Sequence, residues 1–488
     1  MKNTLEEALA RTSPRLVPPP TPFASVAIHL GVMALWFVLF ARAFFLQGVV
    51  AWSTGIAYVV YDTVLLLFVA WKARVLLAPA AAPAAAGAAK LPTLGVIVAA
   101  HNEAAVLPIT LDALFAQTRA PQQIVIADDG STDGTAALLA RRYGLADPGE
   151  GQLSAPSPQY PNLRWLKLAH GGKARALNGA LLAIATETVM TVDADTLLEP
   201  DACAAMASAF GREPELVAAA GLLTPVCDHT LSGRFFQWFQ TYEYIRNFIS
   251  RFAWMRADSL LLISGAFAGF RRDAVMAVGG FDADCLVEDY ELIHRLRRYS
   301  ARKGLGWEVR VLGTARARTD APGTLTTFLR QRRRWFAGFL QTQYWYRDMT
   351  GNRKYGKLGL MMLPVKAFDT VQPIYGLTAF ALLIGFLFDG RFTIVLPVLG
   401  VIVSKIAIDL AFHLYSVHLY RRWSGDRTHS SFGMAFLAAI FEPFSFQLMR
   451  HSGAALGWLH FLLGRRKWGV QSRTGLAAAR SRESAASQ

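Results

Sequence analysis

Long apolar runs near both ends of the chain constrain its fold more than any other feature. Residues 24–46 and 50–72 are each long enough to cross a bilayer as a helix, and a very short connection joins them. They predict a transmembrane hairpin, and the basic residues on either side of it place both of its ends in the cytoplasm. Residues 371–388 and 393–418 predict two further spans, and residues 432–463 predict one span with a re-entrant or interfacial helix.

The composition indicates a membrane protein with a sizeable soluble part. Hydrophobic residues make up 53% of the 488 residues, and charged residues make up only 17%. The formal net charge is +15, but the lysines and arginines concentrate beside the apolar runs. That distribution favours the positive-inside bias of membrane proteins over nucleic-acid binding. The three cysteines lie far apart without metal-ligand spacing, so we expect neither a disulfide framework nor a zinc site.

Between the apolar runs, strand-like and helix-like segments alternate, which predicts an α/β domain with a parallel-type sheet and crossover helices. We expect a cytosolic tail (1–23), the hairpin (24–72), an Ala/Pro linker (78–89), the α/β domain (90–345), interfacial and transmembrane helices (353–464) and a basic, disordered tail (465–488). Within the second helical part, residues 355–370 predict a separate helix that lies in the membrane interface.

Two carboxylates follow a short apolar run that begins at Val189. Asp193 and Asp195 lie one residue apart, so on a strand they project from the same face at its carboxyl end. Ligands of open α/β sheets bind at that edge, and two carboxylates there can share Mg²⁺ or Mn²⁺. The alternative interpretation is a solvated turn.

Polar groups also follow the two expected strands that come earlier in the chain. His101 and Glu103 follow residues 94–100, and Asp129 follows residues 123–127. A carboxylate at the Asp129 position could accept the N3–H of a uracil ring. The alternative is an ordinary turn in which Ser131 or its neighbour Thr132 caps the next helix.

Two further groups lie at expected helix starts. Lys173 follows two glycines and heads a helix, so its charge and the helix N-terminus could both face phosphate, although the pattern is not a Walker A loop. Glu288 and Asp289 open another helix, and a positioned carboxylate such as Asp289 can act as a general base. Acidic residues at a helix start are also favoured by the helix dipole, which is the alternative reading.

Three adjacent arginines and a tryptophan precede the return to the membrane, at residues 331–335. Guanidinium groups bind a diphosphate bidentately, and an indole face suits a sugar ring. The alternative is an anchor at the membrane surface.

Taken in order, these motifs resemble those of the processive family 2 glycosyltransferases with a GT-A fold, which include cellulose, hyaluronan, chitin and poly-N-acetylglucosamine synthases. The resemblance covers residues 90–345, and the flanking membrane segments match the family's layout. The motifs that carry it are Asn102-Glu103, Asp128-Asp129-Gly130-Ser131, Gly172-Lys173, Asp193-Ala194-Asp195, Ser264-Gly265-Ala266-Phe267, Val287-Glu288-Asp289-Tyr290 and Gln331-Arg332-Arg333-Arg334-Trp335. One departure is Val287, where Thr is usual in the family.

The resemblance implies a role for each motif. Asp289 would be the catalytic base, with Glu288 beside it, and Asp195 would hold Mg²⁺ or Mn²⁺. The residues that would bind the nucleotide sugar are His101, Glu103, Asp129, Lys173, Asp193, Gln331 and Arg334. The residues that would bind the acceptor sugar are Ser264, Gly265, Ala266, Phe267 and Trp335.

The resemblance further implies an inverting β-glycosyltransferase of the bacterial inner membrane that polymerises a sugar from a UDP-sugar and passes the polysaccharide outward. UDP-N-acetylglucosamine is the favoured donor and UDP-glucose the next. The expected partners are the donor, the growing polysaccharide, the bilayer and a small membrane subunit, with no nucleic acid. Lys405, Asp409 and Glu442 would line the channel, unless they only join helices to one another.

Two other functions are compatible with these motifs. A non-processive transferase could load one sugar onto a polyprenyl phosphate or a lipid. A transporter or channel could carry an inactive domain that senses nucleotides.

Overall fold

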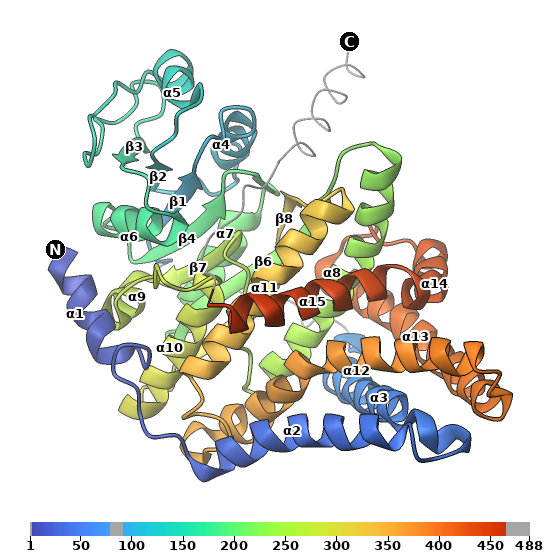
Figure 1. Cartoon of the computed structure of the whole chain (residues 1–488). Helices are drawn as coiled ribbons and strands as arrows, with labels where there is room; N and C mark the ends of the chain where they lie inside the picture. Colours follow the sequence, from blue (N-terminus) through green and yellow to red (C-terminus); the bar gives the residue numbers. More distant parts are fainter. Residues whose placement is uncertain (1, 79–90, 465–488) are drawn as a thin grey trace.

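The computed structural model describes residues 2–78 and 91–464. It consists of an α/β part and a group of long apolar helices that lie beside it (Figure 1). The predicted basic tail at 465–488 and, apart from Ala78, the predicted Ala/Pro linker lie outside the described residues.

An eight-stranded mixed sheet forms the centre of the α/β part, with the order β3-β2-β1-β4-β7-β6-β8-β5. The first four strands in this order are parallel, β7 is antiparallel to both of its neighbours, β6 and β8 are parallel, and β5 is antiparallel to β8. The strands are β1 (Leu94–Ala100), β2 (Gln123–Asp129), β3 (Leu163–Leu168), β4 (Thr188–Asp193), β5 (Thr196–Leu198), β6 (Leu216–Val226), β7 (Phe267–Arg271) and β8 (Glu308–Asp320). The predicted α/β class is confirmed, although only half of the sheet is purely parallel.

The central parallel strands are buried along almost their whole length because helices cover them. In β1, six of the seven residues are buried, and β2 has six buried residues in seven. The crossover helices are α4 (Leu107–Phe115), α5 (Thr135–Tyr143), α6 (Lys173–Ala183) and α7 (Ala202–Arg212). Their arrangement leaves the carboxyl ends of β1, β2 and β4 together at one edge of the sheet.

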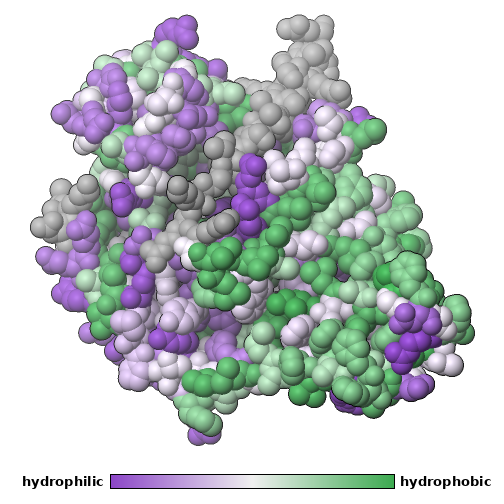
Figure 2. Space-filling view, in the orientation of Figure 1, coloured by the Kyte–Doolittle hydropathy of each residue, from purple (hydrophilic) through white to green (hydrophobic). Residues whose placement is uncertain are grey.

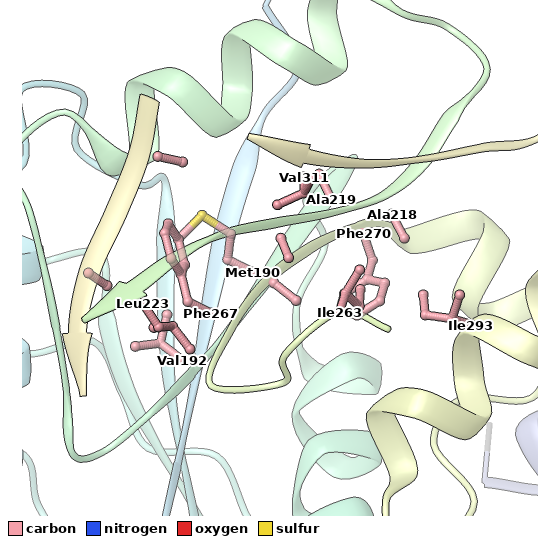
Figure 3. Close-up of a cluster of buried hydrophobic side chains, with 14 of the residues drawn as sticks. Met190, Val192, Ala218, Ala219, Leu223, Ile263, Phe267, Phe270, Ile293 and Val311 are labelled. Carbon is pink, nitrogen blue, oxygen red and sulfur yellow. The ribbon is translucent and has the colours of Figure 1, made fainter. Parts of the chain in front are cut away.

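The core continues across the antiparallel half of the sheet (Figure 3). Met190 of β4 lies near Phe267 of β7, and both side chains are fully buried. Phe270 faces the other way, toward Ile293 of helix α10 (Glu288–Lys303). This packing fixes α10 against the sheet, and α10 begins with the predicted catalytic motif.

Two long helices connect the α/β part with the apolar helices. They are α8 (Leu231–Arg256) and α11 (Leu325–Trp345). Arg332 of α11 donates to both carboxylate oxygens of Glu243 in α8, at 2.9 and 2.7 Å, and both side chains are buried. Removing one partner of a buried ion pair leaves an uncompensated charge, so this pair holds the two helices in one register.

Four helices are long and apolar enough to cross a membrane, or five if the bent pair at the C-terminal end counts as one span. They are α2 (Phe23–Arg42), α3 (Ser53–Ala73), α12 (Leu363–Phe388), α13 (Phe392–Ser424) and the pair α14 (Phe432–Phe441) and α15 (Phe446–Leu462). Hydrophobic surface gathers over these helices, and hydrophilic surface gathers over the parallel half of the sheet (Figure 2). The chain is a multi-pass membrane protein.

The structure differs from the prediction of a separate interfacial helix at residues 355–370. A candidate span runs from Leu358 to Phe388 without a break at residue 370. The polar residues that suggested an interface are satisfied within the bundle, since Lys366 pairs with Asp369 at 2.7 Å and Tyr61 of α3 donates to the same carboxylate. The bent pair α14–α15 turns by 51°, and α15 packs along α11.

The predicted cytosolic tail contains a docked helix, α1 (Lys2–Thr12), which packs on α9 (Arg272–Val278). Thr12 donates to the carbonyl of Val278 at 2.8 Å, and Arg15 pairs with Asp282 at 2.9 Å. Gly279 has φ +92°, and a Cβ there would collide with the backbone nitrogen of Leu9. Close approach of α1 therefore depends on this glycine.

We expect Gly279→Ala to detach α1. The control is Gly304→Ala, which also lies at a left-handed φ, +67°, with strain of about 1–2 kcal/mol, but has open space around its Cβ. Limited trypsin digestion after Arg11 and Arg15 should be roughly tenfold faster in Gly279→Ala, because cleavage follows the population of the detached helix. Equal digestion rates in the two variants would contradict this role.

Candidate active site

The predicted site residues come together where β1, β2 and β4 end. The pairing of Ala100 with Asp128 and of Ala99 with Asp193 brings these strand ends level. β4 ends at Asp193, and Asp195 lies in the turn before β5. The prediction that both carboxylates leave one strand face is therefore wrong, because strand alternation stops at Asp193.

A first group of side chains surrounds Asp129, which is 5% exposed. Its carboxylate accepts hydrogen bonds from the amides of Gly171 and Gly172 at 2.8 and 2.9 Å, and it lies 3.0 Å from Nδ1 of His170. The rings of His101 and His170 stack with centroids 4.4 Å apart. Asp129 therefore fixes the loop that leads into α6 and positions two imidazole rings above the strand ends.

Asp129, His101 and His170 also have ligand atoms within 4.8 Å of one another, which is compatible with a metal ion. However, Nδ1 of each histidine lies within hydrogen-bond distance of the carbonyl oxygen of Asp129, at 2.8 and 3.1 Å. These contacts leave only the Nε2 atom of each ring for a metal ion, and Nε2 of His101 already lies 3.2 Å from the side-chain amide nitrogen of Asn102. The hard-oxygen chemistry of Mg²⁺ or Mn²⁺ fits the carboxylate of Asp195 better than this pair of rings.

A second group joins three elements through Lys173, at the start of α6. Its ammonium pairs with Asp193 at the end of β4 and lies 3.8 Å from Glu288 at the start of α10. Burial alone would lower the pKa of Lys173, but the two carboxylates more than offset it and the pKa lies above its ordinary value. Burial raises the pKa of Glu288, and Lys173 counteracts this only in part. The ammonium group of Lys173 thus lies between the carboxyl groups of Asp193 and Glu288.

Asp289 follows Glu288 and contacts the predicted acceptor segment. Its Oδ2 accepts a hydrogen bond from the amide of Gly265 at 2.7 Å, and its Oδ1 accepts one from the amide of Tyr290 at 2.8 Å. A Cβ at Gly265 would lie 3.1 Å from Oδ2, so the absence of a side chain allows the carboxylate to approach. Gly265 and Asp289, which are far apart in the sequence, therefore lie against each other, whereas the side chain of Phe267 is buried in the core.

The residues of the Arg-rich motif on α11 point in different directions. Arg334 donates to the carbonyl of Leu286 at 3.3 Å, which places it beside the loop that leads into Glu288. Gln331 is buried. Arg332 turns away to Glu243, and its guanidinium lies over the ring of Trp335 at 4.5 Å. Of the predicted diphosphate residues, Arg334 thus lies near Glu288, whereas Arg332 is structural.

Glu243 and His170 are two residues whose contribution the sequence did not predict. Glu243 is the single acidic residue in the 26 residues of α8, which is the signal that could have identified it. His170 was visible only as part of a Gly-rich turn. Glu103 is buried in the turn after β1, and its carbonyl accepts the amides of Val106 and Leu107 at the start of α4.

The raised pKa of Glu288 predicts a pH dependence. Because its folded pKa exceeds the ordinary 4.5, this carboxyl favours the folded state fully only below pH 4.5 and loses that contribution as pH rises through the folded pKa. The contribution of Lys173 persists up to its ordinary 10.5, so it does not affect this range. In Glu288→Gln, the Tm in detergent should therefore fall less between pH 4.5 and 7 than in the wild type. Exposed Glu150→Gln is the control, and parallel profiles for Glu288→Gln and wild type would refute the assignment.

The fold matches that of a known enzyme. A mannosyltransferase from Pyrobaculum calidifontis, PcManGT, solved in complex with GDP-Man and Mn²⁺, superimposes with a TM-score of 0.52 over 81% of this chain and 99% of its own. At 21% sequence identity, this likeness shows the fold alone.

Sequence comparisons identify the family. The family described as "Glycosyl transferase family 2" matches residues 95–279, and "Glycosyl transferase family group 2" matches residues 188–404. Among curated proteins, a poly-beta-1,6-N-acetyl-D-glucosamine synthase of Staphylococcus epidermidis is 27% identical over 282 residues, which is 57% of this chain and 62% of that protein. The synthase of Staphylococcus aureus strain COL is 28% identical over 50% of this chain and 53% of its own length. The chain thus matches less than two thirds of the length of these relatives. It belongs to the family 2 glycosyltransferases and is a distant relative of the poly-β-1,6-N-acetyl-D-glucosamine synthases.

Proposed function

We propose that this enzyme is a processive, inverting β-glycosyltransferase that polymerises a sugar from a UDP-sugar and passes the polysaccharide across the membrane. The observation that carries the proposal is the convergence of Asp193, Lys173, Glu288 and Asp289 at one edge of the sheet, with Gly265 against Asp289. A family 2 transferase needs a donor site and a base near the acceptor, and these residues supply both.

The donor would bind across the two groups of side chains. Asp129, His101 and the turn at Glu103 would hold the uracil and ribose, with the imidazole rings as a flat surface for the base. Lys173 would exchange its carboxylate partners for phosphate oxygens, assisted by the N-terminus of α6. Gln331 and Arg334 would bind the diphosphate from the other side.

Asp195 is the residue that we propose to hold a divalent cation, with Asp193 beside the nucleotide sugar. A bound Mg²⁺ or Mn²⁺ would neutralise charge on the diphosphate. The mannosyltransferase of the same fold was solved in complex with GDP-Man and Mn²⁺, which supports this proposal.

The chain's own residues would carry out the transfer. Asp289 takes the proton of the acceptor hydroxyl, whose oxygen attacks the anomeric carbon as the bond to the UDP oxygen breaks. Lys173 and Arg334 stabilise the negative charge that develops on the leaving diphosphate. A single direct displacement converts the α-linked donor into a β-linked product, and no covalent intermediate is required.

N-acetylglucosamine is the sugar that we favour, and glucose is the alternative. The curated relatives are named as poly-beta-1,6-N-acetyl-D-glucosamine synthases, which supports this choice and the 1,6 linkage. We further propose that the growing polysaccharide is the acceptor, that the α/β part faces the cytosol, and that a small membrane subunit is a partner.

A cavity of about 170 Å³ among the apolar helices supports the proposed export. Lys405, Asp409 and Glu442, the candidate channel residues, all line it. Lys405 pairs with Asp62 of α3 at 2.7 Å and also with Asp409. Paired charges give a polar lining without a strong field, which suits an uncharged polysaccharide. The alternative is that these pairs only join helices to one another.

A chain of ion pairs connects this cavity with α11. Glu442 pairs with Arg246 of α8 at 2.7 Å and lies 3.9 Å from Arg450. Arg450 in turn lies 3.7 Å from Glu243, the partner of Arg332. Because α11 also carries Arg334, the donor site and the membrane cavity share one supporting helix.

Asp289→Asn should lower UDP release from UDP-N-acetylglucosamine by about 10²–10⁴-fold, the usual contribution of a general base. UDP binding, measured by calorimetry, should change little because Asp289 faces the acceptor segment. Exposed Asp389→Asn is the control. Wild-type turnover in Asp289→Asn would refute the assignment of the base. A labelled product that extracts into organic solvent, with no size ladder, would instead favour transfer to a lipid.

Lys405→Met tests the export route. In inverted membrane vesicles, the fraction of labelled polymer protected inside the vesicles should fall several-fold, because the Asp62 and Asp409 carboxylates lose their cation. The double variant Lys405→Met/Asp62→Asn removes one charge of each sign and is the control for net charge. If Lys405→Met lowers thermal stability while the protected fraction stays unchanged, the ion pairs of Lys405 with Asp62 and Asp409 only stabilise helix packing.

A further inference from the structure

A second large cavity, of about 730 Å³, lies between α1, α9 and α10, away from the candidate active site. Figure 1 shows α1 beside α9, at the N-terminal end of the molecule and away from the far ends of the apolar helices. The volume falls within the range of about 300–1,000 Å³ that small-molecule sites occupy. Five cationic side chains and one carboxylate line the wall: Arg11, Arg272, Arg298, Arg302, Lys303 and Asp273.

Protein groups satisfy only part of this charge. Buried Arg298 pairs with Asp348 at 3.1 Å, and Arg272 donates to the carbonyl of Leu181 at 3.3 Å. Over residues 2–78 and 91–464, the side chains of Arg11, Arg302 and Lys303 form no hydrogen bond or ion pair. Their charges therefore remain available to a ligand.

Helix dipoles explain the position of each of these three cations at the end of a helix, but they do not explain why all three line the same cavity. Arg302 and Lys303 lie in the last turn of α10, and Arg11 lies in the last turn of α1, where cations are favourable. That preference does not require the ends of two helices to face one cavity together with Arg272 and Arg298. Like charges around one space repel each other, so an anion that enters it relieves the repulsion.

We propose that this cavity binds a small organic phosphate. The fork of an arginine side chain matches phosphate oxygens bidentately, and Lys303 adds a point charge. Asp273, the single carboxylate of the wall, would accept a hydrogen bond from a ligand hydroxyl, which favours an organic phosphate over a bare phosphate ion. A soluble sugar or glycerol phosphate and the glycerol phosphate headgroup of a lipid share this chemistry.

Binding at this cavity would also act on the active site, a consequence that rests on the proposed function. The cavity wall comes from α1, α9 and α10, so a ligand binds better when α1 is docked and shifts the equilibrium toward that state. Docked α1 places Arg15 against Asp282 and Asp284, both at 2.9 Å, a few residues before Glu288. Helix α10 thus carries the catalytic acids at one end and the cavity cations at the other.

Hydrogen–deuterium exchange of the full-length protein in phosphatidylcholine nanodiscs tests the binding without donor or divalent cation. Addition of sn-glycerol 3-phosphate should slow exchange in residues 4–12 at least threefold, roughly what saturating a weak site gives. Arg302→Gln/Lys303→Gln should weaken this binding about tenfold or more. The matched control is Arg141→Gln/Arg142→Gln, which removes two exposed cations from the last turn of α5 and should bind normally.

The lipid composition of the nanodiscs distinguishes a soluble ligand from a lipid headgroup. Protection by glycerol 3-phosphate in phosphatidylcholine indicates a soluble ligand, and protection that appears only in phosphatidylglycerol nanodiscs indicates a lipid headgroup. Absence of protection under both conditions, or equal protection in Arg302→Gln/Lys303→Gln, would overturn the proposal. Loss of protection in Arg334→Ala would overturn it too, because the anion would then occupy the diphosphate site. Protein that binds the phosphate but releases no UDP would count against the proposed function alone.

Discussion

The site depends on one interaction, the placement of the Lys173 ammonium between the carboxylates of Asp193 and Glu288. Each unpaired charge at this depth would cost several kcal/mol, so the three groups stabilise one another only when β4, α6 and α10 meet. The same contact leaves Asp289, the next residue of α10, facing Gly265. Formation of the fold and assembly of the proposed catalytic carboxylates are therefore one event.

The membrane helices are coupled to this centre through buried charges. Glu243 receives Arg332 from the helix that carries Arg334, and it lies near Arg450 of α15, which in turn faces Glu442 at the membrane cavity. Such a series tolerates little independent movement, because separating the pairs leaves a buried carboxylate, Glu243 or Glu442, without its cation. A transferase that hands each new sugar to an export route requires this kind of fixed relation.

The amino-acid sequence predicts well those strands and membrane helices that show a regular local pattern of apolar residues. The expected strands at 94–100 and 123–127 correspond to β1 and to most of β2, and the predicted spans at 24–46 and 50–72 overlap α2 and α3 almost completely, because local pattern and length decide these elements. The remaining features depend on contacts between residues that are far apart in the sequence. No local signal tells that Arg332 turns to Glu243 while Arg334 faces the acids, or that α1 docks on Gly279. Strand alternation also failed at Asp195, since it holds only while the strand continues.

The most direct measurement compares the affinity of Lys173→Met and wild type for UDP and for uridine, by calorimetry with Mn²⁺ present. If Lys173 leaves its carboxylates to bind the diphosphate, the variant should bind UDP at least about tenfold more weakly, while its affinity for uridine stays nearly unchanged. Equal losses for UDP and uridine, or no loss for UDP, would contradict the account, because Lys173 would then only support the fold.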